Sequence, residues 1–269
     1  MLINLSEAFK LQEHLVAFNI YNLETLTAVL QAAEEENKAV IVSFGESYIR
    51  QAPLAVIASM VKTYAHIVEI PIVLHLDHAT DFQVIREAIE LGFTSVMYDG
   101  SKLPLEENIR RTEEVVEYAR ERGVSVEGEL GYLNKEDGSD EVEIICTTVE
   151  EAFHFIKETK VDALAIAVGN AHGLYKRKPD INLKRIHEIY HETQTPLVLH
   201  GSSGITKEVL GEAFSLGIRK INVNTELALA GSKASYEYLK EQKNTARFEN
   251  VMIEAQAEMK KIAKSFLQI

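Results

Sequence analysis

The sequence predicts an eight-stranded parallel α/β barrel, a (β/α)8 or TIM barrel, with a C-terminal helical extension. Short runs of β-branched and aliphatic residues alternate with amphipathic helical stretches along most of the chain. We count eight such runs with seven helical stretches between them, and several runs are apolar throughout, as parallel strands buried on both faces must be. A doubly wound open sheet is the alternative, but such sheets usually have fewer strands, and no G-x-G-x-x-G motif follows the first run.

The strands are expected where β-branched or aliphatic residues run together between turn residues. In chain order they are Leu15–Asn19, Ala39–Phe44, Ile72–Asp77, Ser95–Tyr98, Ser125–Glu129, Ala163–Val168, Leu197–His200 and Lys220–Val223.

The helices are expected where apolar residues recur every three or four positions. Between the strands these stretches are Leu23–Glu36, Leu54–His66, Asp81–Leu91, Leu105–Arg122, Thr148–Lys157, Leu183–His191 and Lys207–Leu216. Gly92, Gly123 and Gly217 follow three of them, where a left-handed residue commonly ends a helix. A long helical tail is expected from Glu226, and no linker or low-complexity segment divides residues 1–269, so we expect a single domain.

The composition excludes several classes of protein. Among 269 residues, 28 Lys and Arg face 41 Asp and Glu, and the resulting net charge of −13 would repel nucleic acids and anionic membranes. One cysteine, Cys146, excludes an intramolecular disulfide and a cysteine-rich zinc module. The first residues do not resemble a secretory leader, and no apolar run is long enough for a membrane span. We therefore expect a cytoplasmic protein.

Three histidines follow expected strands, at the barrel end that carries the active site in this fold. His78, His172 and His200 come after the third, sixth and seventh strands and could form a three-histidine zinc site with one open position. The alternative is that each histidine has a structural role only, with its ring nitrogens hydrogen-bonded within the fold. His75 lies on the same strand face as Asp77, so we expect it to line the barrel interior as a supporting group.

Carboxylates gather at the same strand ends. Asp77 directly precedes His78 and could transfer a proton, or it could orient a histidine. Asp99, Glu127 and Glu129 follow or belong to the fourth and fifth strands. Clustered carboxylates repel one another unless a cation or a shared proton relieves them, so they suit a metal. The alternative is that they are solvated or paired with Lys and Arg at the rim.

Two glycine- and hydroxyl-rich segments follow the last two strands. Gly201-Ser-Ser-Gly204 and Asn222-Val-Asn-Thr225 offer backbone N–H groups, hydroxyls and the start of a helix, which together suit a phosphate group. Phosphate sites in this position are frequent in TIM barrels, although a Gly-Ser segment by itself is as typical of a plain turn.

Six motifs resemble those of the class II, zinc-dependent ketose-bisphosphate aldolases, the fructose- and tagatose-bisphosphate aldolases. The match runs in order from Ala17 to about Glu226. The motifs are His75-Leu-Asp-His78, Tyr98-Asp-Gly-Ser101, Glu127-Gly-Glu129-Leu-Gly131, His172-Gly-Leu-Tyr-Lys176, His200-Gly-Ser-Ser-Gly204 and Asn222-Val-Asn-Thr225.

The resemblance implies a lyase that reversibly cleaves a ketose phosphate to dihydroxyacetone phosphate and an aldehyde, with fructose-1,6- or tagatose-1,6-bisphosphate as the expected substrate. It implies one Zn2+ per subunit on His78, His172 and His200, with Asp99 and Glu129 holding zinc in an alternative position. It implies that Asp77 exchanges a proton with the oxygen at C4. The implied substrate contacts are Asn19, Ser43, Gly173, Gly201, Ser203, Asn222, Asn224 and Thr225. It further implies a Na+ or K+ ion beside the phosphate and a homodimer or homotetramer.

Two departures from the family pattern leave alternatives open. The segment after the fifth strand, Tyr132-Leu-Asn-Lys-Glu136-Asp137-Gly138, lacks the usual Gly-Gly pair, so either Glu136, our choice, or Asp137 is the base for the C3 proton. Arg247 matches an arginine that binds the distal phosphate of a neighbouring subunit, but the usual preceding Asp-Pro is absent.

Other functions therefore stay open at this point. The substrate could be a monophosphate or a deoxy-keto acid phosphate, and the chain could be a sugar-phosphate binding protein that has lost catalysis. A metal-dependent barrel hydrolase is a further alternative. No lysine stands at the end of the sixth strand, which counts against a Schiff-base mechanism.

Overall fold

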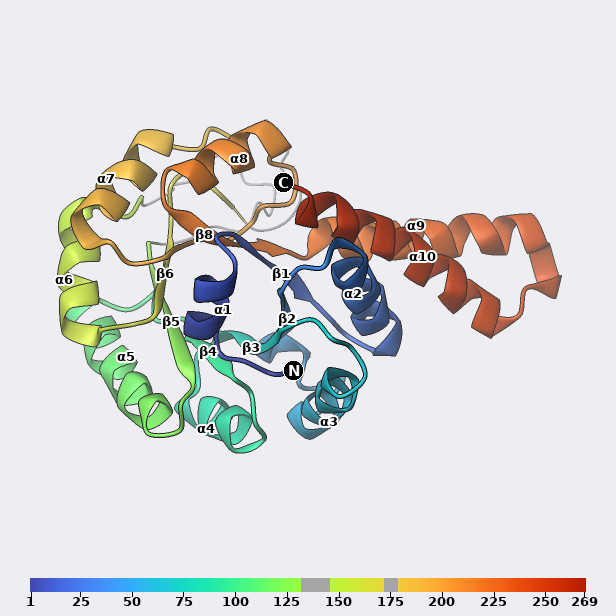
Figure 1. Cartoon of the computed structure of the whole chain (residues 1–269), viewed down its shortest axis with the longest axis horizontal. Helices are drawn as coiled ribbons and strands as arrows, with labels where there is room; N and C mark the ends of the chain where they lie inside the picture. The colour runs from blue at the N-terminus through green and yellow to red at the C-terminus, as the bar shows by residue number, and fades with distance from the viewer. Residues whose placement is uncertain (132–145, 172–178) are drawn as a thin grey trace.

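The computed structural model of the chain is a closed barrel of eight parallel strands surrounded by helices (Figure 1). It describes residues 1–131, 146–171 and 179–269. Each strand pairs with the next in chain order, and the first strand closes the barrel on the eighth. This confirms the predicted (β/α)8 barrel.

The observed elements correspond to all the predicted strands and helices, with differences of a few residues at their ends. The strands are β1 Leu15–Asn19, β2 Val40–Gly45, β3 Ile72–Ala79, β4 Ser95–Tyr98, β5 Ser125–Leu130, β6 Ala163–Ile166, β7 Leu197–Leu199 and β8 Ile218–Val223. The helices around them are α2 Leu23–Glu36, α3 Leu54–Ala65, α4 Phe82–Glu90, α5 Leu105–Arg120, α6 Val149–Thr159, α7 Leu183–Thr193 and α8 Lys207–Ser215.

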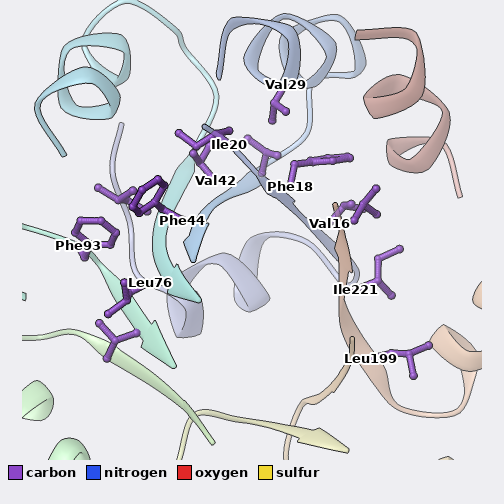
Figure 2. Close-up of a cluster of buried hydrophobic side chains, with 14 of the residues drawn as sticks. Val16, Phe18, Ile20, Val29, Val42, Phe44, Leu76, Phe93, Leu199 and Ile221 are labelled. Carbon is purple, nitrogen blue, oxygen red and sulfur yellow. The ribbon is translucent and has the colours of Figure 1, made fainter. Parts of the chain in front are cut away.

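The two faces of β1 and of β2 contribute to separate apolar clusters, because side chains alternate along a strand. Phe18 and Val42 lie on the outer faces of β1 and β2, and Figure 2 shows them beside Val29 of α2. Ala17 and Ile41, their neighbours in sequence, belong to the cluster of the barrel interior. The outer cluster holds the helices against the barrel, and the inner one fills part of its interior.

A helix that the sequence analysis did not predict, α1 Leu5–Leu11, packs at the amino-terminal end of the barrel (Figure 1). Asn4 accepts a hydrogen bond from the Glu7 N–H, and the Glu7 carboxylate accepts one from the Asn4 N–H. Leu5 and Ala8 are fully buried and belong to the same cluster as the interior residues of the strands. The Asn-x-x-Glu spacing was the sequence signal for this helix.

The predicted helical tail is a pair of helices, α9 Thr225–Gln242 and α10 Phe248–Leu267, which form a hairpin projecting from the barrel (Figure 1). The helix α10 packs against both α9 and α2. Lys260 and Lys264 of α10 lie 2.5 and 3.1 Å from the carboxylate oxygens of Glu35 at the end of α2. Within the described ranges no helix, including these two, combines the length and apolarity of a membrane span.

The packing of α1 predicts a specific loss of stability. Leu5→Ala should lower the free energy of unfolding by about 2–5 kcal/mol, because it leaves a cavity in a fully buried cluster. Urea unfolding followed by circular dichroism measures this change. Leu11→Ala, on the same helix but at a position 64% exposed, should change the unfolding free energy by less than about 0.5 kcal/mol. Equal losses in the two variants would show that α1 is not part of the core.

Candidate active site

The carboxyl end of β3 is bent, and the bend presents two consecutive side chains to the same place. The pairing of β3 with β4 shifts register between Leu76 and Ala79, and His78 has a φ of 49°. This left-handed conformation is uncommon outside glycine and costs on the order of 1–3 kcal/mol. Because of the bend, Asp77 and His78 both bring ligand atoms within 4.8 Å of a ligand atom of His200.

His78 and His200 face each other with their ring nitrogens in contact. Nε2 of His78 lies 2.9 Å from Nδ1 of His200. Their other nitrogens each contact a carboxylate: His78 Nδ1 lies 3.0 Å from Asp99, and His200 Nε2 lies 2.9 Å from Glu127. Burial disfavours ionisation of both carboxyls, but His78 beside Asp99 and Lys220 beside Glu127 outweigh it and hold both pKa values well below the ordinary range.

This contact pattern indicates a place for a cation. Ionised carboxylates only accept hydrogen bonds, so each histidine donates its N–H to its own carboxylate. When both rings are neutral, the nitrogens of His78 and His200 that face each other both carry lone pairs. Two lone pairs at this distance repel, and either a proton on His78 or a metal ion bound by both nitrogens would remove the repulsion.

Further carboxylate oxygens surround the two histidines. Asp77, His78 and His200 form one group whose ligand atoms lie within 4.8 Å of one another, and His78, Asp99 and Glu129 form a second. Oε2 of Glu129 is buried 3.4 Å from His78 Nδ1 and makes no hydrogen bond to any described residue. Imidazole nitrogens with carboxylate oxygens are a donor set that suits a divalent transition metal such as zinc. The described residues therefore fit a metal.

The electrostatics of the site also favour a bound cation. Burial acts to lower the pKa of His78, but the surrounding carboxylates, Asp77 first among them, outweigh it and raise this pKa well above its ordinary value. Burial acts to raise the pKa of Asp77, but the imidazoles of His78 and His200 outweigh it and hold this pKa below the usual range. For Glu129 burial dominates, and its pKa is raised. The site thus favours one extra positive charge, which a proton on His78 supplies in the metal-free protein.

Asp77 is held by two amides from neighbouring strands. Asn19 of β1 donates to one carboxylate oxygen at 2.9 Å, and Asn222 of β8 donates to the other at 3.1 Å. Ser43 Oγ and Asn222 Oδ1 are buried without a hydrogen bond to any described residue. A buried polar atom left without a partner is costly, so these two atoms are suited to contact a bound molecule.

The segment after β7 approaches the backbone of its neighbour closely. Gly201 has a φ of 63°, and a Cβ there would lie 1.9 Å from the Ala171 carbonyl oxygen, so no other residue fits. The Gly204 N–H donates to the Glu226 carboxylate at 2.8 Å, and Ser203 Oγ accepts from the Glu226 N–H at 3.4 Å. These bonds join the segment to the first turn of α9.

Asn224 and Thr225 stand where β8 passes into α9. Asn224 accepts a hydrogen bond from the Tyr21 hydroxyl and donates one to the Tyr48 hydroxyl at 3.4 Å. Thr225 is the first residue of α9, so the positive end of the helix dipole lies beside the segment after β7. The two segments predicted to hold a phosphate are therefore adjacent.

An ion pair in the barrel interior was not anticipated. Lys220 of β8 is fully buried, and its Nζ lies 2.6 Å from Glu127 Oε2 and 3.5 Å from His75 Nε2. Glu127 was expected among clustered metal-binding carboxylates or at the rim, but it belongs to neither metal-suited group among the described residues. His75 lines the interior as predicted, where burial, followed by the charge of Lys220, lowers its pKa to about 3. Lys220 is two residues before Asn222 on the same strand and so shares its face, and this spacing was the signal in the sequence that Lys220 points into the barrel.

The comparisons with known proteins decide the family. The protein-family model for class-II fructose-bisphosphate aldolase matches residues 3–269 of this chain. The chain belongs to the class II fructose-bisphosphate aldolase family. This confirms the resemblance inferred from the sequence motifs and makes the protein a lyase, an aldolase of a family that is generally metal-dependent.

Named relatives and a solved structure agree with this assignment. The fructose-bisphosphate aldolase of Staphylococcus aureus is 43% identical over 230 residues, which cover 84% of this chain and 80% of the relative. That of Geobacillus stearothermophilus is 43% identical over 244 residues, covering 89% and 85%. The crystal structure of the YdjI aldolase from Escherichia coli K12 superposes with a TM-score of 0.88 at 33% identity, over 100% of this chain and 97% of that one.

Some predicted site residues of this aldolase are not in the group described above. His172, Gly173, Glu136 and its alternative Asp137 lie outside the described residues. Arg247 caps α10 in the connection between the hairpin helices, at the end remote from the barrel (Figure 1). Its guanidinium lies 2.5 Å from Glu249. The fold therefore does not bring Arg247 to the mouth of its own barrel.

The raised pKa of His78 predicts that metal binding releases a proton. Because this pKa lies well above the ordinary 6.5, His78 is protonated near pH 7 in the metal-free aldolase, and Zn2+ should displace about one proton there. Calorimetric titration in buffers of different ionisation enthalpy measures this number, and the apparent affinity should rise with pH. In the metal-free protein the same proton stabilises the fold below pH 6.5, and this contribution is lost as the pH rises through the raised pKa.

The control for this titration is His187→Ala on the exposed face of α7, which should leave the proton release unchanged. A binding enthalpy that is the same in every buffer near pH 7 would contradict a protonated His78.

Proposed function

We propose that this chain is a Zn2+-dependent aldolase that reversibly cleaves a ketose 1,6-bisphosphate, fructose-1,6- or tagatose-1,6-bisphosphate, to dihydroxyacetone phosphate and an aldehyde. The observation that carries the proposal is the facing pair of His78 and His200, each with its second nitrogen on a carboxylate, beside Asp77. Cleavage assays with both bisphosphates and the corresponding monophosphates test it. Turnover of a bisphosphate is expected, and no turnover of any ketose phosphate would overturn the proposal.

The proposed metal ligands are His78, His172 and His200, with one Zn2+ per subunit, and Asp99 and Glu129 are the proposed ligands of an alternative position. The nitrogen and oxygen donors of the described part of this set support zinc. When bound, Zn2+ would supply a Lewis acid that polarises the ketone of the substrate.

Asp77 is the proposed acid–base group for the C4 oxygen. Its lowered pKa keeps it ionised, and the amides of Asn19 and Asn222 hold both of its oxygens in place. In cleavage, Asp77 accepts the proton of the C4 hydroxyl, the C3–C4 bond breaks, and its electron pair goes to the dihydroxyacetone phosphate half. Glu136 then protonates C3 and, in the reverse direction, removes that proton.

The phosphate of the dihydroxyacetone phosphate half is proposed to bind after β6, β7 and β8. The proximity of the segment after β7 to the start of α9 supports this placement. The proposed residues are Gly173, Gly201, Ser203, Asn222, Asn224 and Thr225, with a Na+ or K+ ion beside the phosphate. Asn19 and Ser43 are the proposed contacts of the remaining substrate, and the buried Ser43 Oγ supports this role.

The active enzyme is proposed to be a homodimer or homotetramer of one-domain subunits in the cytoplasm. Exposed apolar side chains on the hairpin support an interface there: Leu229, Tyr236, Leu239, Phe248 and Ile253. In such an assembly Arg247, which stands in the connection between the two hairpin helices, would reach the distal phosphate in a neighbouring subunit. The single cysteine fits a reducing compartment.

The proposed ligands predict the fate of the metal. His78→Ala and His172→Ala should lose bound zinc, measured by elemental analysis of the purified protein, while His187→Ala on α7 should retain one Zn2+ per subunit, the stoichiometry of a single catalytic site. Treatment with a chelator should abolish cleavage, and added Zn2+ should restore it. Full activity of a metal-free preparation would contradict the proposed metal.

The roles of the two proposed acid–base residues, Asp77 and Glu136, should be distinguished by two assays. Asp77→Ala should slow cleavage by about 10²–10⁴-fold, while exchange of the C3 proton of dihydroxyacetone phosphate with solvent should largely survive, because exchange needs the metal and the second base. Glu136→Ala should suppress the exchange first. If exchange survives in Glu136→Ala and disappears in Asp137→Ala, then Asp137 is the base. Loss of exchange in Asp77→Ala would contradict the division of roles.

A further inference from the structure

We infer that Glu127, held in place by Lys220, is a positioning residue for His200. It keeps the N–H of His200 on Nε2 and so turns the Nδ1 lone pair toward the metal. The inference rests on the proposed function, because it takes His200 as a metal ligand, and it adds two residues of the barrel interior to the machinery of the site.

The geometry leaves the Glu127 carboxylate little freedom. One oxygen lies 2.9 Å from His200 Nε2, and the other lies 2.6 Å from Lys220 Nζ. The three side chains come from β5, from the residue after β7 and from β8, and each is at most 1% exposed. Rotation of the carboxylate would break at least one charge-assisted hydrogen bond in a place without solvent to replace it.

Lys220 explains why a carboxylate can stand here. An unpaired carboxylate buried in the barrel interior would be strongly destabilising, and the ammonium of Lys220 compensates its charge. His75 also contacts the ammonium, with its Nε2 3.5 Å from Lys220 Nζ and its Nδ1 2.8 Å from Ser95 Oγ. The pair Glu127–Lys220 therefore adds no net charge beneath the proposed metal, so the positive charge of the metal is kept for the substrate.

The hydrogen bond determines which nitrogen of His200 can bind a metal. A neutral imidazole carries one N–H, and it binds a metal only through the other nitrogen. Since the Glu127 carboxylate only accepts hydrogen bonds, it holds the N–H on Nε2. The lone pair is then on Nδ1, which faces His78 and is the nitrogen that can bind the metal. Without Glu127, His200 would bind the metal less tightly, because its tautomer and ring orientation would no longer be set in advance.

The test measures metal binding of the full chain. Glu127→Ala should raise the Zn2+ dissociation constant about 10–100-fold, as measured by competition with a chromogenic chelator. The double variant Glu127→Gln with Lys220→Met should bind within about threefold of the wild type, because the glutamine carbonyl still accepts from His200 and no buried charge is left unpaired. Glu192→Gln on the exposed face of α7 is the matched control and should leave the constant unchanged.

The spectrum of bound Co2+ supplies a second measurement, since its d–d bands report the ligand set and geometry. We expect changed bands in Glu127→Ala and wild-type bands in the double variant, a rescue that a general loss of structure would not produce. Circular dichroism of the metal-free variants establishes that each is folded. If Glu127→Ala does not fold, the double variant still decides: wild-type affinity and bands support the inference, and a loss of tenfold or more in affinity overturns it.

A failure of this inference can be distinguished from a failure of the proposed function. If the wild type binds no Zn2+, or if His78→Ala binds it equally tightly, the proposed function is wrong. If the wild type binds Zn2+, His78→Ala does not, and Glu127→Ala binds as tightly as the wild type with unchanged Co2+ bands, then Glu127 is not a positioning residue and only this inference is overturned.

Discussion

Charged side chains enclosed by the barrel have to satisfy one another, because little solvent reaches them, and the site depends on this constraint. A continuous series of contacts runs from the interior to the mouth. It begins with the ammonium of Lys220 on Glu127 at 2.6 Å and continues from Glu127 to His200 at 2.9 Å. From His200 it passes to His78 at 2.9 Å and ends on Asp99 at 3.0 Å. Each side chain in the series determines what its neighbour can donate or accept, so the lone pair that His200 turns toward His78 follows from an ion pair deep in the barrel.

The two ends of the barrel divide stability and chemistry between them. At the amino-terminal end, α1 adds Leu5 and Ala8 to an apolar cluster, as expected for the end of this fold that provides stability. At the carboxyl end, β3 breaks its register and His78 takes a left-handed conformation, which costs free energy. The strain is sustained because the rest of the barrel is well packed, and it delivers two adjacent side chains to one site. The first turn of α9 lies at the mouth as well, since Glu226 bonds to the segment after β7.

Much of the fold and part of the site could be predicted from local sequence patterns. A period of two residues marks strands, a period of 3.6 marks helices, and parallel strands place all their carboxyl ends on one side. These rules alone predict that His78, His200 and Asp99 lie near one another and that His75 lines the interior. They did not find α1, because a helix of seven residues shows too little periodicity, although Asn4 and Glu7 carried its capping signal.

The sequence by itself therefore determined the order of strands and helices, the family, and the set of polar residues at the barrel mouth, because each of these depends on neighbours along the chain or on motifs within it. Only the tertiary structure decided which of those residues touch. Lys220 and Glu127 are 93 positions apart, and their ion pair depends on how the strands tilt and close into a barrel. The alternation of side chains tells which residues face inward, but not which inward residue on one strand meets which on another. That pairing follows from the closure of the sheet, which no local pattern records.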